Sequence, residues 1–156
     1  MTDCLGCREV AGAIELPGGL LVDEPLVLAF HVPPAVVPEP FLGHLVIVTR
    51  RHVDHLGDLE DAEAEAVGRW ARRLAAALRR VPGVARVHAG VHGLGDPHFH
   101  LHVIPRYVGT PVGLGPFEVD EWEGAPHGGA PQIERLVGRL RQALATQSTR
   151  RSSPAA

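Results

Sequence analysis

The sequence predicts an α+β domain around one mainly antiparallel sheet, with one long crossing helix and a C-terminal helix. Short apolar runs typical of strands come first, a strongly amphipathic helix follows, and further strand-like runs precede a final helix. The chain has 156 residues, which is the size of one ordinary domain. We therefore expect a single domain over residues 1–146 and a flexible C-terminal tail over residues 147–156.

The first strands are expected between turn signals. Apolar runs at residues 20–22 and 27–30 flank the turn Asp23-Glu24-Pro25 and read as a hairpin or meander. Four prolines between residues 33 and 40 predict an extended loop outside the sheet, because proline has no N–H to donate. Apolar composition returns at residues 44–48 and predicts the next strand.

A long helix is expected after Asp58, whose side chain can cap the first turn. Apolar residues then recur at three- and four-residue steps until Pro82 ends the pattern. They are Val67, Trp70, Ala71, Leu74 and Leu78. Arginines occupy most of the opposite face, which we expect to be solvated. Further strands are expected at residues 84–89 and 99–104, and a final helix at residues 131–145.

Composition excludes several classes of function. All 15 cationic side chains are arginine, so neither a Schiff-base lysine nor a P-loop lysine exists here. The net charge of -3 argues against a generic binder of nucleic acid or membrane surfaces, which needs a basic face. No apolar run approaches the length of a membrane span, and Met1-Thr2-Asp3-Cys4 lacks a basic secretion signal, so we expect a cytoplasmic protein.

The most informative segment runs from His98 to His102. Because side chains alternate between the faces of a strand, His98, His100 and His102 are expected to form one row while the residues between them enter the core. Such a row fits a solvated edge strand, a metal centre, or phosphoryl chemistry in which a neutral imidazole attacks phosphorus. Spacing alone does not choose between the last two.

The string His98-Phe99-His100-Leu101-His102-Val103-Ile104 resembles the motif that names the histidine triad (HIT) superfamily. The similarity also covers Cys4-x-x-Cys7, Val27-Leu28-Ala29-Phe30, and Gly43-His44-Leu45-Val46-Ile47 followed by Arg51-His52. This resemblance implies the HIT-like α+β meander, a homodimer, and an activity as nucleotide hydrolase or transferase.

The resemblance also implies roles for individual histidines. His100 would attack the α-phosphorus of a nucleotide and form a nucleotidyl-histidine intermediate that water cleaves. His102 would hydrogen-bond a phosphate or leaving-group oxygen, and His44 would lie close to the same phosphate. The expected enzyme is a hydrolase that cleaves a phosphoanhydride or phosphoramidate bond at a nucleoside α-phosphate, for example in dinucleoside polyphosphates, without an organic cofactor. A non-catalytic nucleotide-binding module and a cupin-like three-histidine metal enzyme remain as alternatives.

A structural Zn²⁺ site is also implied by the resemblance. Cys4 and Cys7 supply two thiolates, and a structural zinc site needs four ligands in a closed tetrahedron. Some bacterial members that resemble this chain complete the set with histidines that correspond to His52 and His98. Such a site would tie the N-terminus to the catalytic strand and would give His98 a structural role.

The sequence departs from the family pattern at the nucleoside end. Val32 stands where many members have an aspartate that binds the ribose hydroxyls, and the glutamine that helps to orient phosphate before the triad is absent. His88, His92 and Asp96 could stand in for these groups or be turn residues. The identity of the nucleoside and the roles of further histidines therefore stay open, namely His31, His55 and His127.

Overall fold

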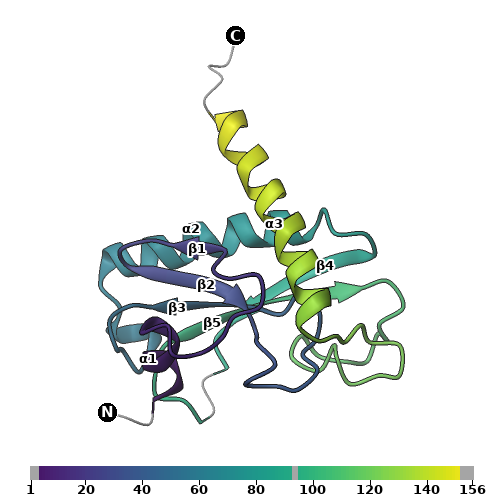
Figure 1. The fold of residues 1–156 in the computed structure, drawn as a ribbon, viewed down its shortest axis with the longest axis horizontal. Helices are drawn as coiled ribbons and strands as arrows, with labels where there is room; N and C mark the ends of the chain where they lie inside the picture. The colour runs from purple at the N-terminus through teal and green to yellow at the C-terminus, as the bar shows by residue number, and fades with distance from the viewer. Residues whose placement is uncertain (1–3, 93–94, 152–156) are drawn as a thin grey trace.

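The computed structural model describes residues 4–92 and 95–151. Five strands form one sheet in the order β1-β2-β3-β5-β4, and every neighbouring pair is antiparallel. The strands are β1 (Val22–Asp23), β2 (Val27–His31), β3 (Leu45–Thr49), β4 (Val84–Gly90) and β5 (His100–Tyr107). The expected α+β fold with a mainly antiparallel sheet is confirmed, and Figure 1 shows the arrangement.

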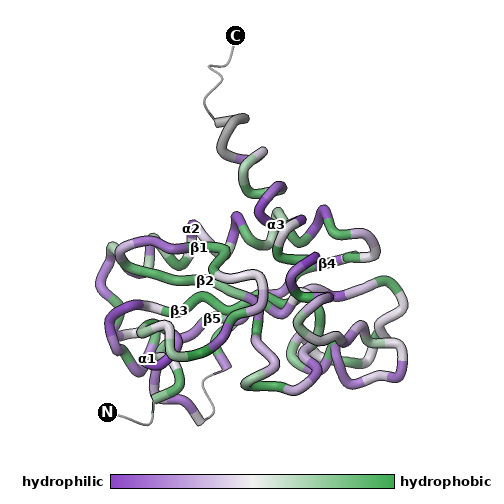
Figure 2. The backbone as a smooth tube through the Cα atoms, viewed as in Figure 1, coloured by the Kyte–Doolittle hydropathy of each residue, from purple (hydrophilic) through white to green (hydrophobic). Residues whose placement is uncertain are grey.

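Strands β2 and β3 are buried on both faces. Every residue of β2 and β3 is buried, and their alternating side chains divide between two apolar clusters. One cluster packs under the long helix and includes Ala29 and Ile47. The other lies on the opposite face, includes Phe30 and Val48, and is covered by the N-terminal segment through Val10. The middle of the sheet is accordingly hydrophobic in Figure 2.

The long helix α2 (Asp61–Leu78) begins later than predicted and has a different cap. Asp58 instead ends a short 3₁₀ turn, η1 (Leu56–Asp58). Glu60 is the N-cap, and its backbone N–H donates to the Glu63 carboxylate at 2.9 Å in a reciprocal capping box. The cap moves because Glu60 has a glutamate three residues later that can complete this box. The predicted apolar stripe of α2 packs on the sheet, with Leu74 fully buried.

The final helix α3 (Ala130–Arg151) is longer than predicted. It continues past Ala145, so residues 147–151 are helical and are not a tail, while residues 152–156 lie outside the described residues. No glycine or proline interrupts the sequence between Gly138 and Pro154, which explains the extension. Figure 1 shows the C-terminal half of α3 projecting from the body.

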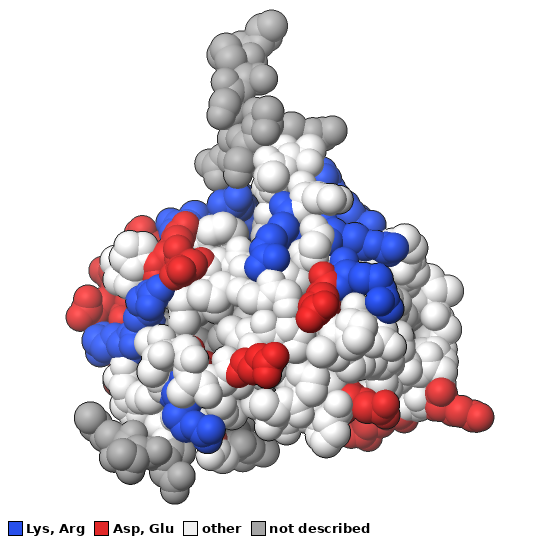
Figure 3. Space-filling view, viewed as in Figure 1, with Lys and Arg blue, Asp and Glu red and all other residues white. Residues whose placement is uncertain are grey.

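The first part of α3 is anchored to the domain. Its apolar face is buried, including Ile133 and Leu140. Arg141 donates to the Leu20 carbonyl at 2.9 Å and to the Gly18 carbonyl, which ties α3 to the segment before β1. Figure 3 shows several cationic side chains around α3 on this face, with acidic side chains beside them and elsewhere on it. Within the part of the chain that the structure describes, no helix is long and apolar enough to cross a membrane.

Candidate functional site

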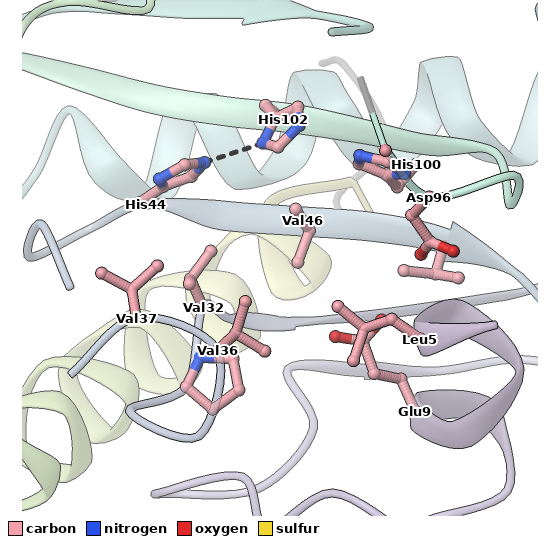
Figure 4. A pocket seen from close by; sticks show the side chains of 13 residues that line it. Leu5, Glu9, Val32, Val36, Val37, His44, Val46, Asp96, His100 and His102 are labelled. Carbon is pink, nitrogen blue, oxygen red and sulfur yellow. Dashed lines mark hydrogen bonds between the residues drawn. The ribbon is translucent and has the colours of Figure 1, made fainter. Parts of the chain in front are cut away.

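A cavity of about 410 Å³ opens on the sheet face opposite α2. Its walls come from α1 (Leu5–Val10), from strands β3 and β5, and from the proline-rich loop that follows β2. The apolar lining residues are Leu5, Val32, Pro33, Val36, Val37, Val46 and Val48. The ionisable lining residues are Glu9, His44, Asp96, His100 and His102. Figure 4 shows the three histidines together on one wall.

The three histidines form a connected group. His100 and His102 alternate on β5, so their rings face the same side with centroids 4.9 Å apart. His44 precedes β3, and its Nε2 lies 2.8 Å from Nδ1 of His102. His100 Nδ1 lies 2.7 Å from the His98 carbonyl. Because a carbonyl only accepts, Nδ1 of His100 carries a proton, and in the neutral ring Nε2 is therefore the nitrogen with the lone pair.

Two of these histidines are held neutral at pH 7. Burial, together with the neighbouring imidazoles, lowers the pKa of His44 to about 3. Burial and the nearby His100 lower the pKa of His102 to about 4. One ring of this pair donates the shared hydrogen bond and the other accepts it. The group therefore combines a ring nitrogen with a free lone pair and polar neighbours that can bind an anionic oxygen.

His31, which had no expected role, fixes the backbone beside His44. Its Nδ1–H donates to the Val32 carbonyl at 2.7 Å, and its Nε2 accepts from the Gly43 N–H at 2.9 Å. Burial lowers the pKa of His31 to about 4, which favours this neutral form. Gly43 has φ +93, and a Cβ there would lie 2.7 Å from Cγ of Pro105. His31 thus holds a turn that only glycine fits.

A second group of side chains lies at the N-terminal end of the site. Cys4 and Cys7 meet His52 and His98, and one ligand atom of each lies within 4.8 Å of all the others. Cys4 Sγ is 3.6 Å from His52 Nδ1 and 3.4 Å from His98 Nδ1. The corresponding distances from Cys7 Sγ are 3.3 and 3.6 Å. The four residues expected to bind zinc are therefore brought together.

The donor atoms fit tetrahedral zinc. Zinc–sulfur bonds of about 2.3 Å and zinc–nitrogen bonds of about 2.0 Å place sulfur and nitrogen about 3.5 Å apart. His98 Nε2 lies 2.7 Å from the Thr49 carbonyl, so it carries the proton and leaves Nδ1 for the metal. Burial raises the pKa of the Cys4 thiol to about 11, so a thiolate there needs a cation beside it. These observations support a structural zinc site of the Cys₂His₂ type.

The predicted row of three imidazoles is wrong in one respect. His98 precedes β5, and its ring joins the cysteines, while only His100 and His102 continue along the strand. Phe99 enters the core as expected, since it is buried and its N–H donates to the Val53 carbonyl at 2.5 Å. The triad is thereby divided between two sites. This division argues against a cupin-like centre with all three histidines around one ion.

Sequence reasoning missed the contribution of α1 to the cavity. Leu5 and Glu9 are four residues apart, so they share one face of this short helix, and both line the cavity. This four-residue spacing was the signal in the sequence that could have indicated a shared helix face. Burial, with a smaller effect of Asp96, raises the pKa of Glu9 to about 7. Asp96 also lines the cavity and accepts a hydrogen bond from the Gly6 N–H at 3.0 Å.

A smaller cavity of about 140 Å³ lies on the other side of the histidine pair. It shares His44 and His102 with the larger cavity and adds His92 and Phe117, whose ring centroids are 4.7 Å apart. Phe117 belongs to the glycine- and proline-rich segment after β5, for which the sequence predicted no role. His88 lines neither cavity, and its Nε2 is buried without a hydrogen-bond partner among the described residues.

These features define a small α+β protein with a histidine-lined cavity next to a Cys₂His₂ metal site. A model of the HIT domain matches residues 14–109, and the chain belongs to the HIT family. An uncharacterized HIT-like protein of Borreliella burgdorferi is 29% identical over 73% of this chain and 83% of its own length. An AP-4-A phosphorylase of Mycobacterium tuberculosis is 29% identical over 69% of this chain, which spans only 53% of that protein.

Solved structures share the fold. A zinc-bound histidine triad family protein from Mycobacterium smegmatis superposes with a TM-score of 0.70 at 20% identity, over 96% of this chain and 98% of that one. A hypothetical histidine triad nucleotide-binding protein from Sulfolobus tokodaii gives a TM-score of 0.71 at 13% identity, over 93% and 94% of the two chains. At these identities the likeness concerns the fold, and it agrees with the sheet and helices described above.

Proposed function

We propose that the protein hydrolyses a phosphoanhydride or phosphoramidate bond at a nucleoside α-phosphate, with His100 as the nucleophile. Membership of the HIT family and the relation to an AP-4-A phosphorylase support nucleotide hydrolase or transferase activity at the level of the family. One observation carries the finer proposal. The Nδ1–H of His100 is engaged by the His98 carbonyl, so its Nε2 lone pair is available in a cavity lined by two further histidines.

The reaction proceeds in two displacements. Nε2 of His100 attacks phosphorus, a P–N bond forms, and the bond from phosphorus to the leaving group breaks. The leaving group departs with the electron pair of that bond and is protonated by water, because His44 and His102 are neutral. A water molecule then attacks phosphorus, the P–N bond breaks, and a nucleoside monophosphate is released as His100 is regenerated. His102 and His44, which are paired at 2.8 Å, bind the phosphate and leaving-group oxygens during both steps.

The zinc site has a positioning role in this proposal. When bound, zinc supplies a rigid link between α1 and the residue before β5, with no part in bond breaking. His98 joins both sites, because its Nδ1 faces the cysteines while its carbonyl accepts from His100. We also propose that the chain acts as one domain and forms a homodimer. The cytoplasmic location remains a prediction.

Activity against a panel of dinucleoside polyphosphates and nucleoside phosphoramidates tests this proposal. His100→Ala should abolish turnover while the thermal stability and zinc content stay close to wild type, and wild-type cleavage should resist a brief exposure to chelator. Undiminished cleavage by His100→Ala would contradict the assignment. Nucleotide binding without cleavage by the wild type would favour a non-catalytic binding module, which the apolar Val32 at the cavity wall keeps as an alternative.

A further inference from the structure

The larger cavity contains a buried carboxyl group that the proposed chemistry does not use. Glu9 is only 8% exposed, lies on α1 and lines the cavity with Leu5. Figure 4 shows its side chain reaching from α1 into the cavity, on the wall that faces the proline-rich loop. Among the described residues its carboxyl oxygens have no hydrogen bond and no ion pair, whereas neighbouring Asp96 accepts from the Gly6 N–H.

An unpaired carboxyl group at such a place is costly to the fold. Glu9 is buried as a residue and its carboxyl oxygens reach only the cavity, so they lose much of their hydration without gaining a hydrogen bond from the described part of the protein. Apolar side chains such as Leu5, Val36 and Val46 share this cavity, and Asp96 is the other carboxylate in its lining. A leucine would fill the same space without that cost. The carboxyl group is therefore better explained by a ligand that hydrogen-bonds to it than by the packing of the domain.

The polar groups of the cavity lie in two places. The histidine wall presents His44, His100 and His102, which suit the phosphate. The α1 end presents Glu9, together with Asp96, whose carboxylate is already bound by the Gly6 N–H. Apolar side chains from the proline-rich loop and β3 line the space between them. A ligand that fills the cavity thus has its phosphate at the histidines, an apolar or planar middle, and a hydrogen-bond donor near α1. A carboxyl oxygen accepts a hydrogen bond whether or not the group is ionised.

We propose that Glu9 is the specificity-determining residue of the nucleoside subsite and accepts hydrogen bonds from donors of the substrate's nucleoside. This inference rests on the proposed function. The donor is either a ribose hydroxyl or an amino group of the base, since both present polar hydrogens to a carboxyl oxygen. Val32, on the opposite wall, has no acceptor for either group. Selection for the donor follows because an analogue without it leaves Glu9 buried and unpaired.

Binding of nucleoside monophosphates tests this inference without any need for turnover. The proteins are wild type, Glu9→Leu, Glu9→Gln, and Glu15→Leu as a control, because Glu15 is exposed and does not line the cavity. Calorimetry compares AMP with its 2′-deoxy and 3′-deoxy analogues, and each amino-bearing base with its unsubstituted form. The Kd of the wild type should rise roughly 10- to 100-fold for a ligand that lacks the recognised donor. Weaker binding of the deoxy analogues identifies a ribose hydroxyl as the group that Glu9 recognises. Weaker binding of the unsubstituted base identifies the amino group instead.

Glu9→Leu should bind all of these ligands equally, at the weaker level, while Glu9→Gln keeps part of the preference through its amide oxygen. The melting temperature of Glu9→Leu should equal or exceed that of wild type, because this variant lacks the unpaired carboxyl group. A wild-type preference that Glu9→Leu retains would overturn the inference, and so would a fall in melting temperature with unchanged affinities. If the wild type binds no nucleotide at all, the proposed function itself fails.

Discussion

Replacing Gly6 with alanine should disturb the metal site. A Cβ at this position would lie 2.5 Å from Cγ, 2.6 Å from Cβ and 2.8 Å from Nδ1 of His98. The His98 ring cannot move aside, because it is 1% exposed, its Nε2–H donates to the Thr49 carbonyl, and its Nδ1 faces the cysteines. In Gly6→Ala, α1 must therefore shift away from His98 and carry its two cysteines with it.

The size of the effect follows from two opposing terms. Forcing one methyl group into a filled core costs about 1–3 kcal/mol, and alanine regains at most about 1 kcal/mol of helix propensity over glycine. With a cost near the middle of that range, about 2 kcal/mol, the free energy of unfolding should fall by roughly 1–2 kcal/mol, which lowers the melting temperature by about 2–8 °C for a chain of this size. A displaced ligand should also weaken zinc binding by about 10- to 100-fold, as for other changes beside a metal site.

Thermal unfolding and zinc competition with a chromogenic chelator measure both effects. Gly68→Ala is the matched control, because Gly68 lies in α2 and a Cβ there meets nothing within 4 Å. The control should be stabilised by up to about 1 kcal/mol and should keep the zinc affinity of wild type. If Gly6→Ala matched Gly68→Ala in both measurements, the close packing of α1 on His98 would be refuted.

Two further predictions concern pH and metal removal. Stability should fall as the pH drops from about 6.5 towards 4, because the pKa values of His31 and His102 are about 4 in the folded state and the unfolded chain takes up protons first. In denaturant titrations, the free energy of unfolding of His31→Gln should depend less on pH than that of wild type, because one titrating group contributes up to about 1.4 kcal/mol per pH unit. An equal pH dependence in the two proteins would refute this. Removing zinc should weaken nucleotide binding as well as stability, since α1 carries Leu5 and Glu9. Unchanged affinity in the chelated protein would show that α1 holds its place without the metal.

Much of the fold could be predicted from the sequence, because apolar periodicity is a local signal. The stripe from Val67 to Leu78 places α2 on the sheet as expected. The errors fall at helix ends, where two patterns compete. Glu60 displaces Asp58 as the cap because Glu63 completes a capping box, and α3 runs on to Arg151 because no breaker stops it.

The site could be predicted in part, since its polar residues carry recognisable spacing. The convergence of Cys4 and Cys7 with His52 and His98 agrees with the expectation from the family pattern. Strand alternation predicted the facing rings of His100 and His102, but it could not show where β5 begins, so the place of His98 in the row was wrong.

The apolar and buried parts of the site were harder to predict. Glu9 and Val36 come from segments far apart in the chain, and only the folded structure brings them to one cavity. His31 has no motif at all. Its role depends on the Gly43 N–H, which lies across the loop and is a backbone group that the sequence does not mark.

The covalent intermediate on His100 tests the proposed mechanism most directly. Wild-type protein is mixed with an excess of substrate and quenched within milliseconds at alkaline pH, where a phosphorus–nitrogen bond to histidine survives, and the intact chain and its peptides are weighed. We predict an added nucleoside monophosphate group on the peptide that contains His100, and no such adduct in His100→Ala. Turnover without this adduct, or an adduct on another residue, would contradict the mechanism.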